Sequence, residues 1–168
     1  RRPPGGLRAR PGDAVRPSGL MCFATVASRS YVALAAPPVS VDVDLAGGLP
    51  SFSIVGLPET TVRESKDRVR AALRNCGFAF PPRRIIVNLA PADLPKSGGR
   101  FDLPIALGVL AASGQMAGES LQGAEFVGEL SLDGRLRPVG GRVSAAATAA
   151  SENLTLFLPA ENVCESSL

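Results

Sequence analysis

Histidine and tryptophan are both absent from the 168 residues of this chain. Without an imidazole, the chain lacks the usual acid–base catalyst, Ser–His and Cys–His nucleophile pairs, and histidine-ligated metal sites. Cysteine is scarce, and Cys22, Cys76 and Cys164 lie far apart without a Cys-x-x-Cys spacing. Such a set is typical of free thiols in a reducing compartment, and we expect no bound metal.

Phosphate-binding loops are absent as well. The sequence contains neither a GxxxxGK[ST] motif nor a GxGxxG motif, so no such loop presents backbone N–H groups to a nucleotide. We therefore expect no cofactor and no ATP hydrolysis in this chain. No apolar run reaches membrane-spanning length, and the apolar stretch 19–27 has no convincing cleavage site after it. We predict a cytoplasmic protein that does not engage a membrane.

Charge is distributed unevenly along the chain. The formal net charge is +3, but residues 1–20 hold five arginines against a single acid, Asp13, which leaves 13 bases and 14 acids elsewhere. Any basic surface beyond this segment must therefore be local. Residues 1–20 lack apolar periodicity, which predicts a disordered extension ahead of a natural start at Met21, with an organelle transit peptide as the alternative. Residues 21–168 are predicted to form one domain.

Hydrophobic periodicity predicts a mixture of strands and helices. Valine alternates with polar residues from Val39 to Leu45, which is the period of a half-exposed strand. The apolar run 85–89 is typical of a central strand, and Asp133-Gly134 of a hairpin turn. The expected strands are 23–27, 39–45, 51–55, 85–89, 125–132, 135–139 and 154–158. Strands that come first and then alternate with helices indicate an α/β fold of the two-layer α+β kind.

Three helices are expected, at Glu59–Asn75, Phe101–Ala112 and 141–152. The first has an acidic residue in its opening turn and Gly77 as its C-terminal stop. The residues predicted for its inner face are Val62, Val69, Leu73 and Cys76.

The first helix also carries a basic stripe. Its members stand at i, i+3, i+7 and i+11, which keeps them on one helical face. The stripe consists of Arg63, Lys66, Arg70 and Arg74. Further bases follow up to residue 100, at Arg68, Arg83, Arg84, Lys96 and Arg100, against Glu64, Asp67 and Asp93. Such a local excess attracts phosphate, whereas the alternative is a solvated face with salt bridges such as Glu64–Arg68.

Aromatic residues are too sparse near these bases for an open base-stacking platform. Phe78 and Phe80 precede Arg83 and Arg84, and the chain has one tyrosine, Tyr31. We therefore expect any nucleic-acid binding to use the backbone, independently of base sequence. The loop 90–100, with two prolines and two glycines, can either cradle an anion or turn a corner.

Several motifs make the chain similar to the ComM/YifB family of bacterial AAA+ proteins, which are related to the ATPase subunit of magnesium chelatase. The motifs are GLPETTVRE at 56–64, DRVRAA at 67–72, VNLAPADLPK at 87–96, GGRFDLPIA at 98–106, FVGEL at 126–130, GRL at 134–136 and VGG at 139–141. They are collinear, and the resemblance extends from about Met21 to the C-terminus.

The resemblance implies a Lon-protease-like N-terminal domain, with a mixed sheet packed by helices, ahead of an AAA+ module beyond residue 168. It further implies a homo-oligomeric, hexameric ring that acts on DNA in branch migration during natural transformation or recombination, with ATP and Mg²⁺ bound in the AAA+ module.

A Lon-like fold raises the question of proteolysis. Compared with the catalytic segments of Lon proteases, this chain has Arg100 in place of the serine nucleophile and Val143 in place of the lysine. Neither can replace the residue that the chemistry needs. Ser97 lies three residues before the position of the nucleophile. The chain has two lysines, Lys66 and Lys96, and Lys96 is adjacent to Ser97. We therefore expect a domain without protease chemistry.

We predict a non-catalytic accessory and assembly domain of a hexameric AAA+ ATPase. Its partners would be the DNA backbone, its own AAA+ module and other copies of the chain. The alternatives are a Ser–Lys peptidase that uses Ser97 and a purely structural module that positions the ATPase ring. The residues expected to contact DNA or a neighbouring subunit are Arg63, Lys66, Arg70, Arg74, Arg83, Arg84, Lys96 and Arg100.

Overall fold

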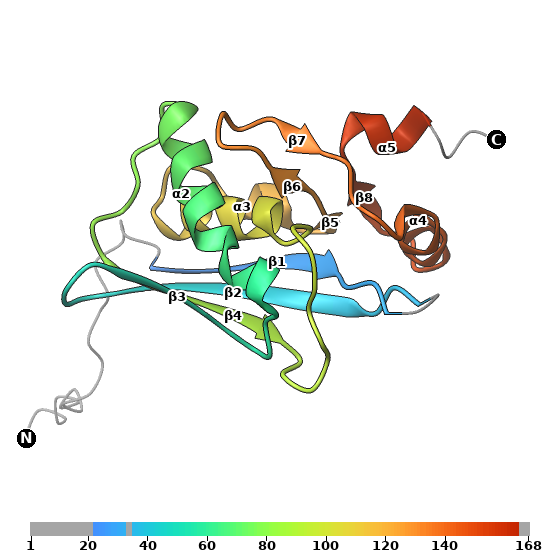
Figure 1. Cartoon of the computed structure of the whole chain (residues 1–168), viewed down its shortest axis with the longest axis horizontal. Helices are drawn as coiled ribbons and strands as arrows, with labels where there is room; N and C mark the ends of the chain where they lie inside the picture. The colour runs from blue at the N-terminus through green and yellow to red at the C-terminus, as the bar shows by residue number, and fades with distance from the viewer. Residues whose placement is uncertain (1–21, 33–34, 165–168) are drawn as a thin grey trace, which may run out of the picture.

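The computed structural model of the chain describes residues 22–32 and 35–164 (Figure 1). The extension expected at residues 1–20 and the predicted start at Met21 lie outside this part. Within it, no helix is long and apolar enough to cross a membrane.

A six-stranded mixed sheet forms the centre of the fold, in the order β3-β4-β2-β1-β5-β8. Its strands are β1 (Phe23–Arg29), β2 (Pro38–Ala46), β3 (Ser51–Val55), β4 (Arg84–Ala90), β5 (Ala124–Phe126) and β8 (Thr155–Phe157). β2 runs antiparallel to both β1 and β4, whereas β3 is parallel to β4, and β5 is parallel to β1 and β8. β4 is therefore an interior strand, as its apolar sequence predicted.

One face of the sheet holds the core. On β2, Val41 and Val43 are fully buried, whereas Asp42 on the opposite face is half-exposed. Val41 lies opposite Leu89 and Val43 opposite Val87, so β2 and β4 point their apolar side chains to the same side. The alternation seen in the sequence is thus the signature of a sheet covered on one face, and the two-layer prediction is confirmed.

The helices α2 (Ser65–Asn75) and α3 (Asp102–Ala112) cover that face, as Figure 1 shows. Val69 and Leu73 anchor α2 in the core. α3 is buried almost all round and packs closely on the sheet at Gly108, where an added Cβ would lie 2.5 Å from Val43. Only a residue without a side chain allows the two backbones to approach so closely.

The helix predicted at 59–75 is two helices. α1 (Thr60–Arg63) ends at Arg63, and α2 begins at Ser65, so that Glu64 caps both helices. The prediction that Cys76 faces the core is wrong, because α2 stops at Asn75 and Cys76 is its exposed C-cap. Val62, by contrast, is fully buried as predicted.

The strand predicted at 125–132 is two strands in different sheets. After β5 the chain leaves the main sheet at Gly128, whose N–H donates to the carbonyl oxygen of Arg100 (2.9 Å). β6 (Glu129–Leu130) then pairs with β7 (Leu136–Arg137) in a separate hairpin around the predicted turn. The third predicted helix is α4 (Arg142–Ser151), whereas η1 (Gly118–Leu121) and α5 (Ala160–Cys164) were not predicted.

A buried arginine connects the first strand to later elements. Arg29 on β1 is fully buried, and its Nε donates to Glu125 on β5 at 2.5 Å. The same guanidinium donates to Glu152 beyond α4 and to the carbonyl oxygen of Ala36. Burial opposes the charge on Arg29, but the hydrogen bonds to Glu125 and Glu152 raise its pKa overall.

A second ion pair connects the two core helices. Asp102, fully buried at the start of α3, accepts hydrogen bonds from Nε (2.6 Å) and Nη2 (3.0 Å) of Arg68 on α2. It also accepts the backbone N–H of Leu130 on β6 at 3.1 Å. The hydrogen bond to Asp102 raises the pKa of Arg68, against the effect of its partial burial.

Candidate phosphate-binding site

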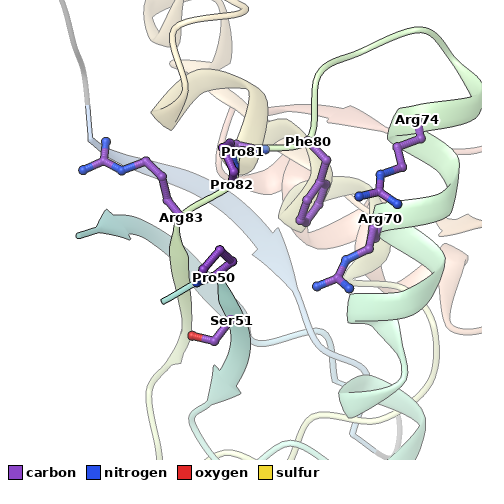
Figure 2. A pocket seen from close by; sticks show the side chains of 8 residues that line it. All are labelled: Pro50, Ser51, Arg70, Arg74, Phe80, Pro81, Pro82 and Arg83. Carbon is purple, nitrogen blue, oxygen red and sulfur yellow. The ribbon is translucent and has the colours of Figure 1, made fainter. Parts of the chain in front are cut away.

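A recess of about 240 Å³ lies between α2 and the segments that lead into β3 and β4. Arg70 and Arg74 stand four residues apart on α2, so both side chains leave the same side of the helix. Figure 2 shows them reaching from α2 toward the ring of Phe80. The remaining walls are formed by Pro50, Ser51, Pro81, Pro82 and Arg83.

Phe80 positions both guanidinium groups. The Cζ atom of Arg70 lies 5.1 Å from the centroid of the Phe80 ring, and that of Arg74 lies 5.9 Å from it. These are cation–π distances. The ring also packs against Phe52 of β3, with 5.9 Å between centroids. Phe80 is thus already engaged by three side chains and serves as a support for the arginines.

The two arginines carry positive charge that no carboxylate of the described residues pairs with. Among the described residues, Arg70 and Arg74 form no ion pair with any carboxylate. The Nε atom of Arg70 is shielded from solvent and has no hydrogen-bond acceptor among the described residues. Arg68, two residues before Arg70 on α2, shows the opposite arrangement because it pairs with Asp102 and, at 3.7 Å, with Glu64.

The structure brings together only some of the predicted contact residues. Arg83 lines the recess, but its Nη1 donates to the sulfur of Cys22 at 3.3 Å, and Figure 2 shows its side chain extending away from the other two arginines. Arg63 belongs to α1 and lines a different recess, with Glu59 and Thr61. The other two exposed members are Lys66 on α2 and Arg84 at the start of β4.

Lys96 is not an exposed contact residue, contrary to the prediction. Its side chain is fully buried, and its amine donates to the carbonyl oxygens of Gly56 (2.7 Å) and Pro91. Burial lowers the pKa of the amine. Lys96 therefore holds the loop 90–100 against the turn before α1, and in this conformation it cannot meet a phosphate.

Arg100 is also buried, with 7% of its surface exposed. It donates to the carbonyl oxygen of Gly140 at 2.7 Å and lies 5.7 Å from the ring centroid of Tyr31. Burial lowers its pKa. Both residues occupy the interior because the loop packs against the turns at Gly56 and Gly140, which the spacing of charges in the sequence does not reveal.

These positions bear on the peptidase alternative. Ser97 is half-buried, and the adjacent Lys96 amine is already bound to two carbonyl oxygens. Arg100 donates to the carbonyl oxygen of Gly140, which brings together the two segments where the resemblance places a catalytic dyad. The side chain of Val143 lies outside the described residues, as does that of Cys164. The described residues contain no cluster of three metal-ligating side chains of the histidine, cysteine or carboxylate type.

Sequence reasoning missed the role of Phe80 and of the prolines around it. The sequence indicates only that aromatic residues such as Phe80 are too few for a base-stacking platform, whereas the structure places Phe80 against the arginines on α2. The available signal was the stop at Gly77, after which the chain must fold back along the helix that it has just left. The positions Pro50 and Ser51 carry no local signal, because β3 reaches the recess only through its pairing with β4.

Comparisons with known proteins match most of this chain. The family model described as subunit ChlI of Mg-chelatase matches residues 41–162. The competence protein ComM of Haemophilus influenzae is 51% identical over 148 residues, which is 88% of this chain and 29% of ComM. The YifB proteins of Salmonella typhimurium and Escherichia coli are 48% and 47% identical over 86% and 84% of the chain. The chain spans less than a third of the length of these relatives.

Proposed function

This chain belongs to the family of the magnesium-chelatase subunit ChlI, and on that premise we propose that it is a non-catalytic accessory domain that binds the DNA backbone for an AAA+ ATPase. Among its relatives is a competence protein, ComM. This supports a role in handling DNA, including branch migration during transformation or recombination. We further propose that the domain has a Lon-like fold and lies in the cytoplasm, and that ATP and Mg²⁺ bind outside this chain.

One observation carries the proposal, namely the pair of uncompensated guanidinium groups in the recess. Arg70 and Arg74 line the same cavity and form no ion pair with a described carboxylate. The sequence also allowed a solvated helical face with salt bridges. On α2, Arg68 forms such salt bridges, whereas Arg70 and Arg74 form none with the described residues. Two adjacent guanidiniums without an acid form a site of high positive potential, and their planar donor sets match phosphate oxygens.

The surroundings of these arginines favour the backbone of DNA over its bases. The Phe80 ring is already covered by Phe52 and by the two guanidiniums, so it offers no free platform for stacking. Contacts to phosphate fix position without reading sequence. A single domain would bind weakly, with dissociation constants of about 10⁻⁴ to 10⁻⁶ M at physiological salt. We propose that six copies in a ring supply the missing affinity through multivalency.

Reversing two charges tests this proposal. In the full-length protein, Arg70→Glu/Arg74→Glu should weaken binding to a DNA duplex and flatten the dependence of log K on log salt by about 2 per domain engaged. The reason is that two fewer cations displace counterions from the DNA. The measurement is fluorescence anisotropy of a labelled duplex over a series of salt concentrations.

The matched control is Arg135→Glu/Arg137→Glu, which makes the same change in net charge on the exposed β6–β7 hairpin. It should leave the salt dependence close to that of the wild type. If the Arg70/Arg74 variant and the wild type show equal slopes of log K against log salt while the variant fails to assemble, then Arg70 and Arg74 form a subunit interface. If neither binding nor assembly changes, the domain is a structural module.

A further inference from the structure

We infer that the recess between Arg70 and Arg74 is a site for a phosphate monoester, and that its ligand on DNA is the terminal phosphate of a strand. This inference rests on the proposed function and specifies which phosphate the site prefers. It is carried by three features of the recess: its proline-lined wall, its charge and the donors it leaves unused.

The rigid proline wall on one side of this half-open recess favours an end over the middle of a strand. Pro50, Pro81 and Pro82 form rigid walls opposite the α2 arginines, and the recess between them has a volume of about 240 Å³. Proline rings are fixed to the backbone, so these walls cannot rotate away as longer side chains do. An internal phosphodiester is bonded to a sugar on each side, and both sugars would have to clear the walls. A terminal phosphate has a sugar on one side only and can enter end-on.

The charge and the donors match a monoester. A phosphate monoester carries about −1.5 to −2 charges at pH 7 and presents three strong acceptor oxygens, whereas an internal phosphodiester carries one charge. Arg70 and Arg74 supply two positive charges, and among the described residues neither is neutralised by a carboxylate. Each guanidinium has five N–H donors in a planar fork. Both guanidiniums lie against the ring of Phe80, which accepts no conventional hydrogen bond, and the buried Nε of Arg70 has no acceptor among the described residues.

Phe80 holds the fork in place for this ligand. Because it lies within cation–π distance of both guanidiniums, the two side chains are ordered before the ligand arrives. Pre-ordering lowers the entropy cost of binding. Ser51 lies on the opposite wall of the cavity, and Figure 2 shows its hydroxyl directed away from the two arginines, so the donors of the site are the guanidiniums.

The test compares two oligonucleotides that differ only at one end. The 168-residue chain is titrated against a ten-nucleotide single strand with a fluorophore at its 3′ end and either a phosphate or a hydroxyl at its 5′ end. The 5′-phosphate is expected to tighten binding about tenfold, the effect of one hydrogen bond to a charged group. In Arg70→Gln/Arg74→Gln the preference should disappear, whereas Arg135→Gln/Arg137→Gln should retain it. Competition with inorganic phosphate and with a nucleoside 5′-monophosphate then distinguishes a strand end from a free monoester.

The outcomes separate this inference from the proposed function. Equal binding of both strands by the wild type overturns the terminal-phosphate site, although DNA binding that is still weakened in the Arg70/Arg74 variant would leave the backbone role intact. A 5′-phosphate preference that survives in that variant places the site elsewhere and overturns the inference. A free monophosphate that competes as strongly as the phosphorylated strand would show that the recess binds small phosphate esters and would overturn the strand end as its ligand. Equal thermal melting of all variants excludes unfolding as the cause of any loss.

Discussion

Replacing Arg29 by methionine is expected to lower the free energy of unfolding by about 4 kcal/mol, within the range for breaking a buried ion pair. Arg29 is fully buried, and its partner Glu125 is 3% exposed. The substitution leaves that carboxylate in the interior without a counter-charge and also removes the hydrogen bonds to Ala36 and Glu152. Urea unfolding measures the change, and the melting temperature should fall by about 3 °C for each kcal/mol lost.

A second variant separates the charge from the packing. Arg29→Met/Glu125→Leu replaces both charges by apolar groups of similar volume, so it should recover most of the stability that the single substitution loses. Arg137→Met is the matched surface control, since Arg137 is exposed on β7, and it should change stability by less than about 0.5 kcal/mol. A loss that is the same in the single and the double variant would mean that the ion pair is not what holds β1 to β5.

Replacing Asp102 by asparagine is expected to lower the free energy of unfolding by about 3 kcal/mol. The substitution keeps the shape of the side chain but removes its charge, and one of its two oxygens becomes an N–H donor. Asp102 currently accepts two hydrogen bonds from Arg68 and one from the backbone of Leu130. These bonds connect α2, α3 and the β6–β7 hairpin at a fully buried point, so all three contacts weaken together. Thermal unfolding followed by circular dichroism provides the measurement.

The same chemical change on the surface of α2 is the control. Asp67 is exposed, and Asp67→Asn should leave stability within about 0.5 kcal/mol of the wild type. Similar losses in both variants would show that the effect reflects net charge and not the buried contact. Glu64 also lies near Arg68, but at 3.7 Å and with a side chain that is 60% exposed, so it cannot compensate for the loss of Asp102.

The candidate site shows how far local patterns reach. The i, i+4 spacing of Arg70 and Arg74 is a property of the sequence, and it correctly places both side chains on one side of a helix. Whether such a face is paired with acids depends on its neighbours in space. Arg68 finds Asp102, which is 34 residues away in the chain, whereas the two stripe arginines find the ring of Phe80. No local rule distinguishes these two outcomes, because the partners arrive from other elements.

By itself, the sequence determined the layers of the fold and showed that histidine and the two phosphate-binding motifs are absent. The alternation along β2 required a sheet with one buried face, and the two absences follow from the residues and their order without any tertiary contact. Tertiary structure alone decided which charges are accessible. Lys96 and Arg100 resemble surface bases in the sequence but are buried, because the loop that carries them folds against the turns at Gly56 and Gly140. Tertiary structure also decided that residues 125–132 divide between two sheets and that the ring of Phe80 lies against Arg70 of α2. These outcomes depend on contacts between residues distant in the chain, where packing and burial override the preferences of short segments.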